Sequence, residues 1–255
     1  MNSKTFATLL IATAVSASQN TKIGVISDLH INEFYDAATS ANLCRLSTLE
    51  TSSNADLYAP LSRYGCDPSS TLVDYMLTRF KEKFGAVDVI LVPGDSVTHK
   101  TSASAEGQDP TGSAYAAVKA NLQATFSKLV EHFPSTVIIP TFGNNDGRYH
   151  DEAIDETDKS DYYNFVYDLW FKNFSGNSNL DLASIKSTFI NGGYYRADIN
   201  SSLSVLSVNT MYFDLNDNSL HNGEQVLVNN WFEYELSLAK TEGRKVIITA
   251  HVYAG

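Results

Sequence analysis

The chain has 255 residues, of which 43% are hydrophobic, which suits one α/β domain with a sizeable core or, as the alternative, two small domains. Its formal net charge is −11, and the sequence contains no run of basic residues. Binding to duplex nucleic acid and coating of a polyanion are therefore disfavoured, whereas a small anionic ester is not excluded.

The N-terminus has the pattern of a secretory signal peptide. Lys4 supplies a basic region, Phe6 to Val15 form an apolar stretch, and Val15-Ser16-Ala17 is a small-residue cleavage site. We expect residues 1–17 to be the signal peptide and residues 18–255 to be the mature domain; a buried N-terminal helix is the alternative. The expected location is outside the cell or in a lysosomal or vacuolar lumen. No later apolar run is long enough to span a membrane.

The rest of the chain alternates apolar runs of strand length with segments of helical spacing. Strands are expected at 22–27, 87–92, 136–142, 194–198, 203–209 and 245–250, and helices at 69–84, 115–133, 162–174 and 225–241. Loops are expected at 32–70 and 101–113, and a turn at Gly192-Gly193. On the first of these helices, one side is expected to carry Leu72, Tyr75, Met76, Arg79 and Phe80. This alternation predicts an α/β fold with helices flanking a central sheet and no internal domain boundary.

Two cysteines and two glycosylation sequons agree with an oxidising, secretory environment. Cys44 and Cys66 lie in the same segment between the first two strands, so a disulfide is expected, with two free thiols as the alternative. Asn173 and Asn200 each begin an Asn-X-Ser sequon. The sequence therefore predicts a glycoprotein with one disulfide.

Polar motifs follow four of the apolar runs. They are Asp28-Leu29-His30, Gly94-Asp95, Gly143-Asn144-Asn145-Asp146 and His251. Each motif lies just past the carboxyl end of a predicted strand, which is where open α/β sheets place their sites. Asp, His and Asn are oxygen and nitrogen ligands for a divalent metal. Together the four motifs predict a dinuclear metal centre.

The motifs resemble those of the calcineurin-like metallophosphoesterases, whose signature runs DxH, GD, GNH[DE], a lone His and GHxH. The first four blocks occur here in order, whereas the GHxH block does not, and Asn145 stands where that family has His. The resemblance implies a layered fold of central mixed β-sheets flanked by helices. It also predicts that the C-terminal strands of that fold are missing, as in a truncated chain.

Shorter fragments resemble one branch of this superfamily, the acid sphingomyelinase-like phosphodiesterases that lack a saposin domain. The spacing from Gly94-Asp95 to His99 matches that branch. So do the fragments at 63–68, 191–195, 206–210, 231–233 and 247–255. The resemblance implies a small phosphodiester substrate, of the nucleotide or phospholipid-headgroup type, and leaves contact with a lipid surface open.

The resemblance also assigns metal ligands. Asp28 and His30 would bind a first ion, Asn144 and His251 a second, and Asp95 would bridge both. Asp28 and His30 are two residues apart, which on an extended segment places their side chains on one face. Two divalent ions are expected, with zinc (Zn2+) as the metal, holding a hydroxide that attacks phosphorus.

Two residues are candidates for assisting the leaving group. The amide of Asn145 can donate a hydrogen bond but cannot transfer a proton as a histidine does. His99 could supply that proton instead; an exposed loop histidine is the alternative. Loss of a general acid typically costs about 10²–10⁴ in rate, and the cost is least for a leaving group that is already a good anion.

The sequence thus predicts a secreted, metal-dependent phosphodiesterase. The first alternative is a catalytically impaired pseudoenzyme or phosphate-ester binding protein, because of Asn145 and the missing GHxH block. The second is a phosphomonoesterase of the purple-acid-phosphatase kind. A ligand Tyr after Asp95 would mark that kind, and Ser96 to Thr98 contain none.

Overall fold

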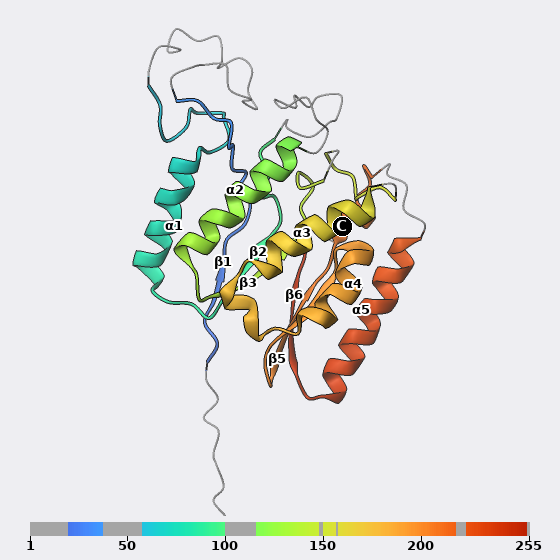
Figure 1. Cartoon of the computed structure of the whole chain (residues 1–255). Coiled ribbons are helices and arrows are strands. Elements are labelled where there is room, and N and C mark those ends of the chain that lie inside the picture. The colour runs from blue at the N-terminus through green and yellow to red at the C-terminus, as the bar shows by residue number, and fades with distance from the viewer. Residues whose placement is uncertain are drawn as a thin grey trace, which may run out of the picture.

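The computed structural model describes residues 20–37, 58–99, 116–147, 150–156, 158–217 and 223–253. Within these ranges the chain forms two three-stranded sheets with helices packed around them (Figure 1). The predicted α/β fold with mixed sheets and flanking helices is confirmed. In the described part, no helix is both long and apolar enough to cross a membrane.

The first sheet is entirely parallel and contains strands β1 (Ile23–Val25), β2 (Val89–Pro93) and β3 (Val137–Thr141), in that order. Ile23 is paired with Val89, and Val89 with Val137. Val89 to Val92 are all buried, as expected for a central parallel strand that is covered on both faces. The carboxyl ends of the three strands therefore lie at one edge of the sheet.

The second sheet is mixed. Strand β4 (Tyr195–Asn200) runs antiparallel to β5 (Leu203–Ser207), which pairs in parallel with β6 (Lys245–Thr249). Side chains of this sheet reach β3, because the hydroxyls of Tyr195 and Ser207 both donate to the carbonyl of Pro140, at 2.6 and 3.0 Å. The hydroxyls of Thr141 at the end of β3 and Thr249 at the end of β6 lie 3.2 Å apart, so the ends of these two strands are close enough to share one site.

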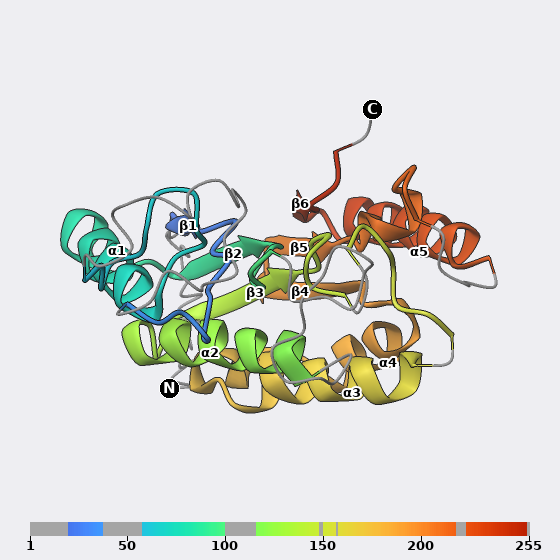
Figure 2. The ribbon, with the colours of Figure 1, turned by 90° about the horizontal axis from the view of Figure 1, so that it is seen from above.

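Within the described ranges, five α-helices surround the sheets. They are α1 (Ser70–Phe84), α2 (Ala116–His132), α3 (Lys159–Tyr167), α4 (Leu182–Gly192) and α5 (Glu224–Thr241). A π-helical turn, Asp168–Lys172, continues α3, and short 3₁₀ turns lie at Ser175–Asn179 and Thr210–Phe213. Figure 2 shows α2, α3 and α4 along one face of the sheets, with α1 and α5 at opposite ends.

Helix α1 begins where the sequence predicts, because Ser69 caps it by accepting from the N–H of Leu72. The predicted face is wrong. Tyr75 and Met76 are 58% and 38% exposed, whereas Val73 and Leu77 are buried. The buried residues are four positions apart and so lie above one another on the helix.

Helix α4 was not predicted from the sequence. Ile185 and Phe189 are buried on it, and Phe189 packs against Trp170 with ring centroids 5.6 Å apart. The helix ends at Gly192, and Gly193 adopts a left-handed conformation (φ 71°) as its C-cap. The predicted Gly-Gly turn is therefore the end of this helix.

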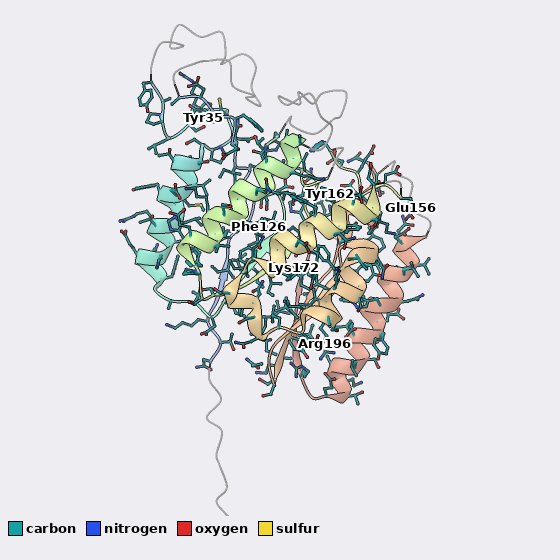
Figure 3. All side chains as sticks on the ribbon, viewed as in Figure 1. Tyr35, Phe126, Glu156, Tyr162, Lys172 and Arg196 are labelled. Atoms are coloured by element: carbon teal, nitrogen blue, oxygen red, sulfur yellow. The ribbon has the colours of Figure 1, made fainter. Side chains whose placement is uncertain are left out.

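The side chains of Tyr162 and Arg196, both labelled in Figure 3, tie helices to the rest of the molecule. The hydroxyl of Tyr162 on α3 donates to the carbonyl of Asp146, in the loop that follows β3. Arg196 of β4 binds Glu235 and Glu242 of the α5 region, the first at 3.1 Å. Helix α3 thus holds the loop after β3 through a side-chain hydrogen bond.

Several sequence predictions lie outside the described residues. They are the signal peptide at 1–17, Cys44 with its predicted disulfide to Cys66, and the loop at 101–113. Asn173 and Asn200, which begin the two sequons, are exposed. Glycosylation and the disulfide stay predictions.

Candidate metal centre

The first two predicted ligands lie in the loop after β1, which runs beside the loop after β2. The N–H of Asp28 donates to the carbonyl of Gly94 (3.3 Å), and the N–H of His30 to the carbonyl of Asp95 (3.0 Å). Asp28, His30 and Asp95 have positive φ angles of 56°, 42° and 55°. Such conformations cost non-glycine residues about 1–3 kcal/mol each and cluster at functional sites. The prediction of an extended Asp28–His30 segment is therefore wrong, because both residues are left-handed.

The side chains nevertheless converge on Asp95. Nε2 of His30 lies 3.3 Å from Oδ2 of Asp95, and Nε2 of His251 lies 3.4 Å from Oδ1. Oδ1 of Asp28 is 4.0 Å from Nε2 of His30. One ligand atom each from Asp28, Asp95 and His251 lie within 4.8 Å of one another. Asp95 is thus central, and its two oxygens face two different imidazoles, as a bridging ligand requires.

Backbone carbonyls orient both imidazoles. Nδ1 of His30 lies 2.9 Å from the carbonyl of Val97, and Nδ1 of His251 lies 2.8 Å from that of Pro93. A carbonyl only accepts, so each Nδ1 carries the proton and each Nε2 lone pair faces the site. A hydrogen bond on the far nitrogen is the usual support of a metal-binding histidine.

Asn144 gives direct evidence that the site suits a cation. Its Oδ1 lies 2.9 Å from Nε2 of His251, while its Nδ2 donates to Oδ1 of Asp151 at 2.7 Å. Because Nδ2 is engaged with a carboxylate, Oδ1 must be the atom that faces His251. Two acceptors then face each other, a pairing that a cation or a proton between them stabilises. These residues fit a metal ion.

Asp146 organises the loops around the ligands. It is fully buried and accepts from the N–H groups of Asp95, Ser96, Val97 and Gly143 at 2.8 to 3.1 Å. Burial, followed by the charge of Asp95, raises its pKa above the ordinary value, and the N–H groups of Gly143 and Val97 offset only part of this shift. All four contacts are donors, which is the pattern of an ionised carboxylate.

Gly143 lets the loop after β3 approach Asp95 closely. A Cβ built on Gly143 would collide with the backbone nitrogen and the carboxylate of Asp95. The loop after β3 can therefore approach the bridging residue only where the side chain is absent.

His99 lies beside the predicted metal ligands. Its ring stacks on His30 with centroids 4.1 Å apart and planes inclined by 21°. Nδ1 of His99 is 2.9 Å from Oδ1 of Asp67. Burial tends to raise the pKa of Asp67, but hydrogen bonds from His99 and Thr98 outweigh it and hold that pKa below its ordinary value. The bond to Asp67 leaves Nε2 of His99 as the nitrogen available to a ligand.

Asn145 lies at the site but points inward. Its side chain is buried, and its Nδ2 donates to Oδ2 of Asp95 at 2.9 Å while its backbone N–H donates to Oδ1 at 3.0 Å. The amide that replaces the family's histidine thus supports the bridging carboxylate.

The structure therefore brings together all seven predicted site residues. The sequence did not identify the contacts of Asp67 and Asp146. Asp67 precedes a proline at the start of α1, and Asp146 ends the third motif. Their partners are distant in sequence or buried backbone groups, so no local pattern reveals these contacts.

A carboxylate that lies between two imidazoles at the edge of an α/β sheet has the features of a two-ion hydrolase site. The family model of the calcineurin-like phosphoesterases matches residues 21–255, and the chain belongs to this family. The predicted family is confirmed.

Relatives within this family carry several names. The chain is 26% identical over 247 residues to "Endopolyphosphatase" of Schizosaccharomyces pombe. This alignment covers 89% of this chain and 40% of that protein. It is 26% identical over 198 residues to "Sphingomyelinase phosphodiesterase D" of Dictyostelium discoideum, with 76% and 40% covered. It is 24% identical over 234 residues to "Cyclic GMP-AMP phosphodiesterase SMPDL3A" of Bos taurus, with 90% and 48% covered. The chain thus spans less than half the length of each of these relatives.

Proposed function

We propose that the protein is a secreted or lumenal metal-dependent phosphodiesterase of the acid sphingomyelinase-like kind. The observation that carries the proposal is the convergence of three strand-end motifs on Asp95, whose oxygens lie 3.3 and 3.4 Å from His30 and His251. Family membership supports hydrolysis of a phosphoester. The phosphodiesterase names of two relatives support the diester as substrate.

The chain's own residues would divide the work as follows. Asp28 and His30 would hold one ion, Asn144 and His251 the other, and Asp95 both. Two bound divalent ions, with zinc as the proposed metal, would lower the pKa of a bound water and neutralise charge on the phosphate oxygens.

His99 would deliver a proton to the leaving oxygen from Nε2. Its Nδ1 is fixed by Asp67, and its ring stacks on His30, which keeps Nε2 near the site. The Asp67 carboxylate accepts from Nδ1 and so fixes the orientation of the ring, as an acidic partner does for a catalytic histidine. Asn145 would act through Asp95, since its amide already donates to that carboxylate.

A second candidate substrate is a phosphoanhydride, such as a short polyphosphate. Nδ2 of Asn145 is engaged with Asp95, so this position offers no transferable proton to a leaving group. A phosphate leaving group is a good anion and needs a general acid least. The name of the Schizosaccharomyces pombe relative, endopolyphosphatase, agrees with this candidate. The net charge of −11 opposes binding of a long polyanion, so the diester remains the first proposal.

The test is hydrolysis of a chromogenic phosphodiester by the purified protein with zinc, with a chelator, and as Asp95→Asn. Loss of activity in both the chelated and the mutant samples is expected, because Asp95 serves both halves of the site. A parallel assay with inorganic polyphosphate decides between the two substrate classes. Binding of both ions and of phosphate without turnover of either substrate would instead identify a pseudoenzyme.

A further inference from the structure

The side-chain amide of Asn144 contacts two side chains of the loop that follows it. Its Nδ2 lies 2.7 Å from Oδ1 of Asp151 and 2.9 Å from Nε2 of His150. Nδ1 of His150 lies 3.2 Å from Oδ2 of Asp151. The three side chains therefore contact one another in a closed triangle.

The donors and acceptors of this triangle have one consistent assignment. Asn144 Nδ2 has two hydrogens and donates one to Asp151 and one to Nε2 of His150. His150 then carries its proton on Nδ1 and donates it to Asp151. Every contact pairs a donor with an acceptor.

The backbone holds the same two residues together. The N–H of Asp151 donates to the carbonyl of Asn144 at 3.0 Å, and Asp151 has a left-handed backbone with a φ of 64°. Asp151 thus binds Asn144 at both its carbonyl and its side-chain amide. A strained conformation with two such contacts is typical of a residue whose position serves a site.

The orientation of the amide matters because its two ends differ chemically. Oδ1 can bind a cation, whereas Nδ2 presents hydrogens that repel one. The two ends are nearly equal in size, so shape alone does not choose between them. An acceptor-only carboxylate next to Nδ2 does choose, and it directs Oδ1 to His251 at 2.9 Å.

We propose that Asp151 and His150 are positioning residues that hold the Asn144 amide in its metal-binding orientation. The inference rests on the proposed function only in that Asn144 and His251 are taken as ligands of the second ion. Residues that orient a ligand in this way typically contribute about 10–100-fold to metal affinity.

The central variant is Asp151→Gly. Glycine accepts the positive φ without strain and keeps the backbone N–H, so only the carboxylate is lost. Zinc binding to the metal-free protein is measured by calorimetric titration, and metal content by mass spectrometry. The expected result is one unchanged site and a second site weakened about 10–100-fold, while the metal-free variant melts no lower than the metal-free unmodified protein.

Asp151→Asn is the conservative variant, since its amide oxygen can still accept from Asn144, and partial recovery of the second site is expected. His150→Ala should weaken the second site less than Asp151→Gly, because it leaves in place the shorter contact of Asn144 Nδ2, the one to Oδ1 of Asp151 at 2.7 Å. The matched control is Asp168→Asn. Asp168 is a partly exposed aspartate that pairs with Lys172 in the π-helical turn continuing α3.

Equal affinity of both sites in Asp151→Gly and the unmodified protein would overturn the proposal, as would an unmodified protein without a second ion. These readouts need no turnover. An inactive protein that binds two ions, and loses the second in Asp151→Gly, would contradict the proposed function while supporting this inference.

Discussion

The two halves of the proposed metal centre are built in different ways. The first half-site, Asp28 and His30, is fixed by backbone hydrogen bonds between the loops after β1 and β2. The second half-site, Asn144 and His251, depends more on side chains, although the carbonyl of Pro93 also orients His251. Asp151 and His150 orient Asn144, and the hydroxyl of Thr210 accepts from the N–H that follows His251, at 2.9 Å.

This difference bears on which substitutions each half tolerates. Backbone bonds survive replacement of neighbouring side chains, so the first half-site should keep its geometry in most point variants. A side-chain support is lost in a single substitution. We therefore expect variants around the second half-site to yield a protein that binds one ion, and variants around the first to leave ion binding intact.

The largest expected effect sharpens this contrast through His99. This residue stacks on the first half-site but contacts no atom that the second requires. His99→Ala should lower turnover by about 10²–10⁴-fold, because the leaving group loses its proton donor. Zinc content, measured by mass spectrometry, should stay at two ions. Unaltered turnover would remove His99 from the mechanism.

The next effect breaks the contrast, because Asp146 supports both halves. Asp146→Ala leaves four buried N–H groups without their acceptor, and the free energy of unfolding should fall by at least about 3 kcal/mol. Both ions should then bind more weakly. Urea denaturation with and without zinc measures the loss, and Asp168→Ala, a partly exposed position, is the control. A variant as stable as the unmodified protein would contradict the role given to Asp146.

The smallest effect lies outside both halves, between α1 and α2. Asp74 binds Lys128 at 2.8 Å and His132 at 3.1 Å. Burial tends to raise its pKa, but hydrogen bonds from Lys128 and His132 outweigh it, so the pKa lies below the ordinary 3.8. Asp74 is partly exposed, and Asp74→Asn should cost no more than about 1 kcal/mol.

The pH dependence of this pair follows from the direction of the shift. A carboxyl whose folded pKa is depressed stabilises the protein above its unfolded pKa and loses that contribution as the pH falls through the folded value. The difference between Asp74→Asn and the unmodified protein should therefore be full at neutral pH and shrink below pH 3.8. Thermal melts of both proteins across pH measure this difference. As a control, zinc binding at neutral pH should be the same in Asp74→Asn and in the unmodified protein.

Much of this architecture follows from sequence pattern. The apolar runs of β2 and β3 and the polar motifs behind them are local signals, and parallel strands bring their carboxyl ends together. Helix α4 was missed although Ile185 and Phe189 have helical spacing, because the two glycines after them suggested only a turn. The face of α1 was misjudged because Tyr75 and Met76 are apolar enough to mimic a buried side.

Other features could not be read from the sequence at all. Nothing in Asp28-Leu29-His30 signals a left-handed backbone, since the conformation depends on hydrogen bonds to the loop after β2. The contact between His150 and Asn144 joins residues six positions apart, which matches no regular secondary structure. Both features arise from tertiary packing and have no local propensity to predict them.

The left-handed backbone at Asp28, His30 and Asp95 has a consequence for directed evolution. Glycine adopts such φ angles without strain, so a glycine in place of the exposed Asp28 would relieve about 1 kcal/mol or more. A glycine in place of Asp95 would also leave the two buried N–H donors of Asn145 without their acceptor, which opposes that gain. A library screened for heat resistance alone should therefore enrich glycine at Asp28 and yield stable proteins that bind metal more weakly. Screening for bound zinc at each round would keep Asp28, and its frequency among heat-resistant clones would measure how strongly metal binding and thermal stability compete in this fold.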